Sequence, residues 1–339
     1  MTPLNVALPA GYTARPVTLD DAEAAADLLN AYNIALTGRP CIASGEIRSY
    51  WQQPTMHPAT DTLAVFAPDG AAMVGEAELW NTDPHVTHFV FGEVHPAHQG
   101  RGIGAALAAW AEARGRELLP SAPEDSRVIL QQFIMSTDAP AERFLQDRGY
   151  ALTRHNLRMT IDFAGPPPRP SLSDGVTIRP FIRGEEEASL LRAIRDAFRD
   201  HWGYVEQPWD EDYQGWLHYM HTDPNFDPAL TFVAMAGDEI VGTSICNPNW
   251  VEDPGAGWIH SLGVRRSWRR RGVALALLQH TFVALYERGK NGAKLGVDAE
   301  SLTGATRLYE KAGMHMERQF SFYEKELRAG ADLTTKVVE

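Results

Sequence analysis

A cluster of arginines stands immediately before a glycine in the second half of the chain. These residues are Arg265, Arg266, Arg269, Arg270 and Arg271. Gly272 and the small Ala274 follow them and would let a ligand come close to the backbone. The free N–H groups and the dipole at the start of a helix favour negative charge, and arginine adds paired hydrogen bonds to phosphate oxygens. The spacing therefore predicts a pyrophosphate-binding loop at the start of a helix.

A second loop of this kind lies in the first half of the chain. It follows Val94 and reads Gln99, Gly100, Arg101, Gly102, Ile103, Gly104. One such loop could be a solvated basic turn, but the recurrence of the pattern favours anion binding. A dinucleotide fingerprint fits less well because neither loop lies near the start of a regular βαβ unit. A P-loop is excluded because Val273 follows the last glycine where lysine is needed.

The two loops belong to a repeat of domain length. Residues 13–16 match residues 177–180, residues 143–149 match residues 307–313, and the loops fall between these pairs in the same order. A proline-rich run at 165–171 separates the copies and predicts an extended spacer. We therefore expect an N-terminal domain over 1–164, a linker over 165–172 and a C-terminal domain over 173–330.

The elements that must position the second loop follow from its flanking patterns. The second copy predicts strands at 176–179, 231–235, 239–246, 258–264 and 294–298, and helices around 190–198, after 272 and over 303–311. Gly237 and Asp238 predict a tight hairpin turn. Because strands precede and separate only a few helices, the expected class is α/β, as an α+β mixed sheet.

Composition limits the kinds of partner. The 339 residues include 44 acidic and 31 basic side chains, a formal net charge of −13 that disfavours nonspecific nucleic-acid or membrane binding. Two distant cysteines, Cys41 and Cys246, exclude a disulfide framework and a cysteine-rich zinc site. No apolar stretch approaches the length of a membrane span, so we expect a cytoplasmic protein.

Two segments of the second copy carry a family resemblance. Leu262-Gly263-Val264 followed by Arg269-x-x-Gly272-x-Ala274 resembles the acyl-CoA-binding motif of the GCN5-related N-acetyltransferases (GNAT), and residues 297–314 resemble that family's other signature. Residues 94–104 match the first motif again. The resemblance implies two tandem GNAT-like acyl-CoA N-acyltransferase domains, acetyl-CoA as cosubstrate without a metal, and a small-molecule amine as acceptor.

The resemblance also implies which residues contact the cofactor. In the second copy they are Leu262, Val264, Arg269, Arg270, Arg271, Gly272, Val273 and Ala274, and in the first copy they are Val94, Gln99, Gly100, Arg101, Gly102 and Gly104. Backbone N–H groups around Leu262 and Val264 are expected to polarise the thioester carbonyl.

The resemblance makes Tyr309 the expected proton donor to the departing thiolate, although it could instead be a packing residue. His260 is a candidate general base because its intrinsic pKa is near ~6.5, and Asp298 or Glu300 could act through a water. In the first copy Leu145 aligns with Tyr309 and cannot donate a proton. We therefore expect the C-terminal domain alone to catalyse.

Aromatic and acidic residues after the first helix of the second copy suggest an acceptor site. Trp202, Tyr204 and Trp209 are the candidates because aromatic rings and carboxylates together suit a cationic amine. The same residues could be the core and the solvated face of an amphipathic helix. His218 and His221 have no predicted third ligand, so no metal site is expected. A non-catalytic acyl-CoA-binding or interaction protein is the alternative function, and the sequence does not predict an oligomeric state.

Overall fold

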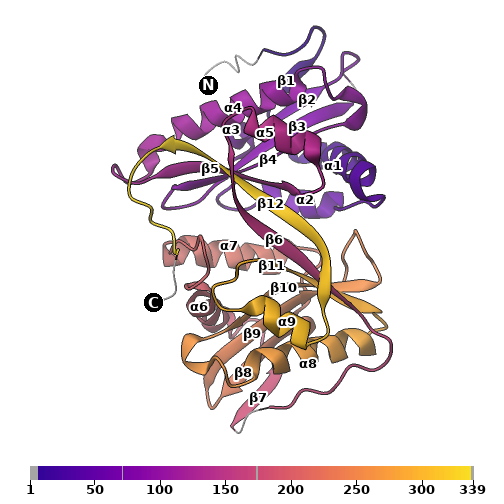
Figure 1. The fold of residues 1–339 in the computed structure, drawn as a ribbon, viewed down its shortest axis with the longest axis vertical. Coiled ribbons are helices and arrows are strands. Elements are labelled where there is room, and N and C mark those ends of the chain that lie inside the picture. The colour runs from indigo at the N-terminus through magenta and orange to yellow at the C-terminus, as the bar shows by residue number, and fades with distance from the viewer. Residues whose placement is uncertain (1–6, 71, 173–174, 337–339) are drawn as a thin grey trace.

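The computed structural model describes residues 7–70, 72–172 and 175–336. Within these residues one sheet of twelve strands runs through the molecule in the order β1-β2-β3-β4-β5-β12-β6-β11-β10-β9-β8-β7. Figure 1 shows the N-terminal half, in indigo and magenta, above the C-terminal half, in salmon to yellow. The sheet is mixed, since β4 and β10 each have one parallel and one antiparallel neighbour.

The bounds of the elements agree closely with the sequence expectations. The strands are β1 (Thr13–Arg15), β2 (Thr62–Phe66), β3 (Met73–Asn81), β4 (Thr87–Val94), β5 (Val128–Met135), β6 (Ala151–Asp162), β7 (Val176–Pro180), β8 (Thr231–Ala236), β9 (Glu239–Asn247), β10 (Ala256–Val264), β11 (Gly292–Asp298) and β12 (His315–Arg328). The helices are α1 (Ala22–Thr37), α2 (Ser44–Trp51), α3 (Pro58–Asp61), α4 (Ile103–Glu117), α5 (Ala139–Gln146), α6 (Glu187–Phe198), α7 (Trp209–Thr222), α8 (Val273–Glu287) and α9 (Ala305–Lys311). The helix expected over 303–311 begins two residues late because Gly304, in the left-handed conformation, is its N-cap.

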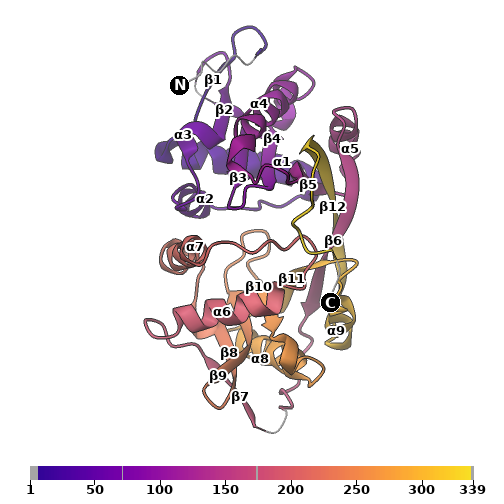
Figure 2. The same cartoon turned by 90° about the vertical axis from the view of Figure 1, so that its left-hand side faces the viewer.

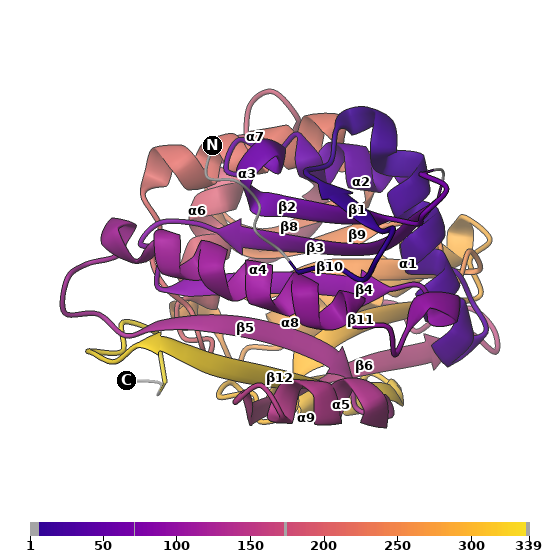
Figure 3. The same ribbon diagram turned by 90° about the horizontal axis from the view of Figure 1, so that it is seen from above.

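Helices cover both faces of the sheet in each half. The apolar stripe of α8, including Leu277, Leu278 and Leu285, is buried against one face, and α6 packs with α7 on a separate core cluster. In the N-terminal half α4 buries Leu107 and Trp110, while α1 and α2 form their own cluster. The equivalent helices α5 and α9 lie on the same side of the molecule (Figures 2 and 3).

The two longest strands interlock the halves. Strand β12 lies between β5 and β6, and β6 in turn pairs with β11 of the C-terminal half. Each half thus receives into its sheet the last strand of the other, visible in Figure 1 as two strands that run from one half to the other. The expected linker at 165–172 falls in coil between β6 and β7 in its described part. The halves are therefore joined by main-chain hydrogen bonds as well as by the linker.

Candidate active sites

The C-terminal half contains a cavity where two parallel strands diverge. Among the described residues β10 pairs with β11 only over residues 256–259 and 292–295, and the register of β10 on β9 shifts between Ile259 and Ser261. Such a bulge bends a strand and redirects its side chains. A cavity of about 260 Å³ opens there. Its lining includes His201, Trp202, His260, Leu262, Asp298 and Tyr309.

Tyr309 reaches this cavity from α9. Its side chain is 6% exposed, and burial raises the pKa of the phenol to about 12. The hydroxyl therefore keeps its proton at neutral pH and is able to donate a hydrogen bond into the cavity.

His260 occupies the bulge and lines the same cavity. Its ring stacks on Tyr219 with centroids 5.3 Å apart and meets Trp216 edge-on at 6.5 Å. His260 is exposed in the cavity, and the protein packed around it lowers the pKa of the imidazole by disfavouring its charged form. His260 is therefore neutral at physiological pH, the form in which an imidazole accepts a proton.

Asp298 lines the cavity but is already engaged. One carboxylate oxygen accepts a hydrogen bond from Arg154 Nε at 2.7 Å and the other accepts from the Glu300 N–H at 3.0 Å. Because both oxygens already accept hydrogen bonds from the protein, Asp298 is less available than His260 to contact an incoming amine.

The three predicted acceptor residues separate in the structure. Trp202 lines the cavity, whereas Tyr204 and Trp209 are not among the described residues of its wall. The chain turns away at Gly203, whose φ is +80°. Trp209 stacks on Tyr213 at 5.4 Å and lies under two guanidinium groups of α6, which matches the helix-packing alternative.

One lining residue comes from the other half of the molecule. Asn156 on β6 reaches the C-terminal cavity because β6 pairs with β11. Asn156 was not predictable from the sequence, since no local pattern shows that a strand of the first copy enters the sheet of the second.

The arginine loop has the predicted backbone conformation, but some of its arginine side chains are paired with other groups of the protein. Gly272 is the left-handed N-cap of α8, and Arg270 is also left-handed, with φ +62°. The Arg269 guanidinium points inward, to Asp200 at 2.5 Å, to the Ala197 carbonyl at 3.0 Å and to the Val264 carbonyl at 3.3 Å. Arg269 therefore fixes the loop, and contacts to an anion would fall to the backbone and to its neighbours.

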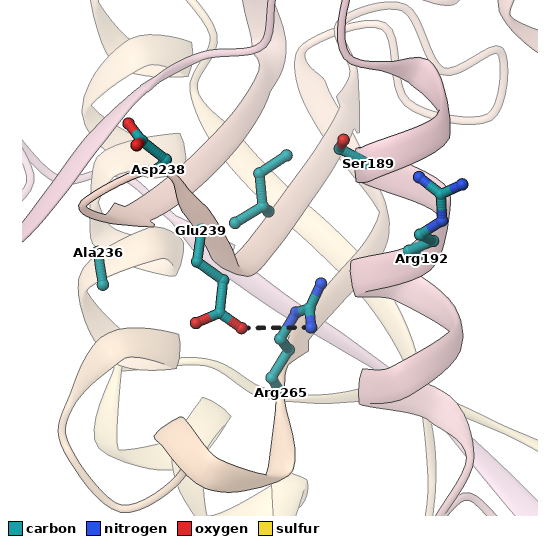
Figure 4. A pocket seen from close by; sticks show the side chains of 7 residues that line it. Ser189, Arg192, Ala236, Asp238, Glu239 and Arg265 are labelled. Carbon is teal, nitrogen blue, oxygen red and sulfur yellow. Dashed lines mark ion pairs between the residues drawn. The ribbon is translucent and has the colours of Figure 1, made fainter.

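A second arginine of the cluster is also paired. Arg265 forms an ion pair with Glu239 at 3.3 Å in a shallow hollow beside the β8–β9 hairpin (Figure 4). Arg192 of α6 lines the same hollow. None of the residues predicted to be catalytic is among the described residues that line this hollow.

The glycine loop of the N-terminal half repeats this geometry. Gly100 and Gly102 are left-handed, with φ +71° and +91°, and α4 begins at Ile103. Gln99 Nε2 donates to the Val94 carbonyl at 3.3 Å, as Arg269 Nε does to the Val264 carbonyl. Arg101 donates to the Tyr12 hydroxyl at 3.1 Å.

The N-terminal half also contains the larger cavity. Its volume is about 620 Å³, within the range of ligand pockets. All the predicted cofactor residues of this half except Arg101 line it, namely Val94, Gln99, Gly100, Gly102 and Gly104. The cavity of the C-terminal half, by contrast, is lined by no described residue of its loop. Leu145, which aligns with Tyr309, is 2% exposed and packs in the core.

Two other features bear on the sequence expectations. No helix in the described ranges combines the length and apolar character needed to cross a membrane. His218 Nε2 lies 3.0 Å from the Ser49 carbonyl, and among the described residues no cluster of three metal-binding side chains occurs.

A family model described as the acetyltransferase (GNAT) family matches residues 28–150 and 191–314. A mycothiol acetyltransferase of Streptomyces scabiei is 32% identical, over 76% of this chain and 76% of the relative. A mycothiol acetyltransferase of Thermobispora bispora is also 32% identical, over 72% of this chain and 77% of the relative. A crystal structure of a GCN5-related N-acetyltransferase from Sphaerobacter thermophilus is 35% identical, covers 97% of this chain and all of its own, and has a TM-score of 0.78. A tandem GNAT protein from the clavulanic acid pathway shares the fold at 16% identity, a TM-score of 0.66, and coverage of 94% and 100%. The predicted fold class and the duplication are confirmed.

Proposed function

The chain belongs to the acetyltransferase (GNAT) family, and from this premise we propose that it transfers an acetyl group from acetyl-CoA to a primary amine of a small molecule, by direct attack in a ternary complex. The predicted N-acetyltransferase class is confirmed by the family match over both halves. The relatives named mycothiol acetyltransferases favour a small-molecule acceptor.

The observation that carries the proposal is the cavity that holds Tyr309 and His260 where β10 and β11 diverge. Acetyl-CoA supplies a thioester, whose carbonyl would lie beside the unpaired edge of β10 at Leu262 and Val264. His260 accepts the proton that the attacking amine loses, and Tyr309 donates a proton to the departing sulfur. Burial disfavours a thiolate as it disfavours a phenolate, so the departing sulfur gains from taking up a proton within the cavity.

The two loops would hold the pyrophosphate groups. In each loop the backbone N–H groups at the start of a long helix, α4 or α8, are available to an anion. Because Arg265 and Arg269 are paired internally, Arg270 and the backbone around Gly272 and Val273 carry this role in the C-terminal half.

Release of free CoA, followed with a thiol reagent across a panel of small amines, tests the proposal. We expect acceptor-dependent release, and we expect Tyr309→Phe to lower the kcat of the C-terminal site by roughly 10²-fold or more, since general acid catalysis contributes about 10²–10⁴-fold. Tyr323→Phe is the matched control, because this buried phenol donates to Glu142 at 3.0 Å outside the cavities. Acetyl-CoA binding without acceptor-dependent release would support the non-catalytic alternative.

A further inference from the structure

The cavity of the N-terminal half brings an anion-binding loop and a strand divergence into one continuous space. Among the described residues β4 pairs with β5 only over residues 87–89 and 129–131, and β4 then runs on through Gly92 and Glu93. Both of these residues line the cavity, as do the loop residues at 99–104 apart from Arg101. A pyrophosphate on the loop and a thioester between the strands would therefore occupy a single cavity.

Glu93 lines this cavity together with four other titratable side chains, those of Tyr32, His98, Asp138 and Arg148. Burial raises the pKa of its carboxyl to about 7, and the negative charge of Glu78 adds to the effect. Glu76 and Glu78 face it from β3, Glu76 as its direct cross-strand partner, and Tyr32 faces it from α1. Trp51 and Trp80 donate their indole N–H groups to Glu78 and hold it in place. Glu93 can therefore exchange a proton near neutral pH.

A phenol reaches the same cavity from an unexpected element. Tyr32 on α1 donates its hydroxyl proton to a carboxylate oxygen of Asp138, and the other oxygen of Asp138 accepts from the Ala141 N–H at 3.0 Å to cap α5. Asp138 is 5% exposed. Because α1 packs on β3 and β4 whereas α5 follows β5, this hydrogen bond spans the divergence between β4 and β5. Tyr32, Asp138 and Glu93 all line the cavity.

We propose that the N-terminal half is a second acetyl-transfer site, in which Glu93 is the proton acceptor and Tyr32, rather than a residue of α5, is the proton donor. The inference rests on the proposed function, since it uses the same thioester. Leu145 stands at the end of α5, where the other half has the phenol of Tyr309. The sequence therefore suggested that this half is inactive. The structure supplies a phenol from α1 instead.

The site would take a small amine that is cationic in solution, because two acidic side chains, those of Glu93 and Asp138, line its cavity. Glu93 removes one proton from the ammonium group and later releases it to solvent. The amine nitrogen then forms the C–N bond while the C–S bond breaks. Tyr32 gives its proton to the departing sulfur and regains one from the newly acylated nitrogen. The products are the N-acetyl amine and CoA thiol, with one proton released.

The test measures acceptor-dependent CoA release by the full chain carrying Tyr309→Phe, alone and with Glu93→Gln or Tyr32→Phe. We expect turnover to remain in the Tyr309→Phe protein, and each added substitution to lower it at least tenfold. Tyr323→Phe in the same background is the matched control and should leave the remaining turnover unchanged. Thermal unfolding and titration with CoA establish that each variant is folded and still binds the cofactor.

The pattern of losses separates this inference from the proposed function. Complete loss of turnover with Tyr309→Phe would overturn the second site and agree with catalysis by the C-terminal site. Residual turnover that neither Glu93→Gln nor Tyr32→Phe lowers would do the same. Full activity of Tyr309→Phe together with loss in Glu93→Gln would support the second site and contradict catalysis by the C-terminal half. A wild-type chain that releases no CoA with any amine would overturn both.

Discussion

Single residues in the two cavities differ in how burial sets their protonation. Burial raises the pKa of Tyr309 to about 12 and that of Glu93 to about 7, and it lowers that of His260. The shift at Tyr309 preserves a proton donor. Near pH 7 the shift at Glu93 leaves a carboxyl that gains or loses a proton easily, and the shift at His260 leaves a neutral imidazole. The chemistry proposed for each half therefore follows from where the fold removes water.

The shift at Glu93 predicts a pH-dependent cost in stability. The pKa of Glu93 is about 7 in the folded protein and exceeds the ordinary value of 4.5. The contribution of its protonated carboxyl to the free energy of unfolding is therefore complete below pH 4.5 and is lost as the pH rises through 7. Between pH 4.5 and 8 the free energy of unfolding of the wild type should therefore fall, relative to that of Glu93→Gln, by up to about 3 kcal/mol. Denaturant unfolding at both pH values measures this. Glu124→Gln, at an exposed position of the same half, is the control, and an equal pH response of wild type and Glu93→Gln would refute the prediction.

Residue roles were predictable from sequence only where the chemistry is local. The glycines and arginines of the two loops occupy the expected backbone positions because their conformational demands lie within a few neighbouring residues. The inward turn of Arg269 was not predictable, since its partner Asp200 lies 69 positions away. Tyr32 was not identified either, because a tyrosine on a helix is most often a packing residue and Asp138 is distant in sequence.

At the scale of elements, the end of α6 fixes the loop before α8. Asp200 follows α6, and Arg269 links its carboxylate to the Ala197 and Val264 carbonyls. Asp200 is 6% exposed, so the pair is shielded from solvent. The Arg269 guanidinium therefore joins the end of α6 to the loop between β10 and α8.

Asp200→Ala should therefore destabilise the protein by about 1–3 kcal/mol, because it removes the carboxylate from a partly buried guanidinium that keeps only its two carbonyl acceptors. Asp196→Ala removes a more exposed pair, with Arg199 at 3.6 Å, and should cost less than about 1 kcal/mol. Chemical denaturation compares the two variants. Equal effects would mean that the Asp200–Arg269 pair does not hold the loop. The double variant Asp200→Ala, Arg269→Gln installs the glutamine found in the other loop and should recover part of the loss.

At the scale of the whole molecule, the sequence predicted the duplication but not the exchange of strands. The repeat and the proline-rich spacer predict two copies, and each copy has the expected order of strands and helices. The position of β12 between β5 and β6 depends on pairing between residues more than 150 positions apart, as for Ser321 with His155. No local pattern in the sequence encodes such pairing.

The exchange predicts that the N-terminal half is not stable alone. In a fragment of residues 1–164, β6 would lose both of its neighbours, β11 and β12, and β5 would lose one edge. Unpaired strand edges favour aggregation. We expect the fragment to be insoluble or to lack a cooperative thermal transition, whereas the full chain unfolds in a single one. A soluble fragment that melts cooperatively at the temperature of the full chain would contradict the interlocked sheet.

The most direct test of cofactor binding at both helix starts is titration calorimetry of the full chain with acetyl-CoA. We expect two equivalents per chain. Gly102→Asp and Gly272→Asp form a matched pair, since each places a carboxylate at a left-handed N-cap with open space around it, and each should remove one equivalent. No heat of binding, or two equivalents that survive both substitutions, would show that these loops do not hold the cofactor.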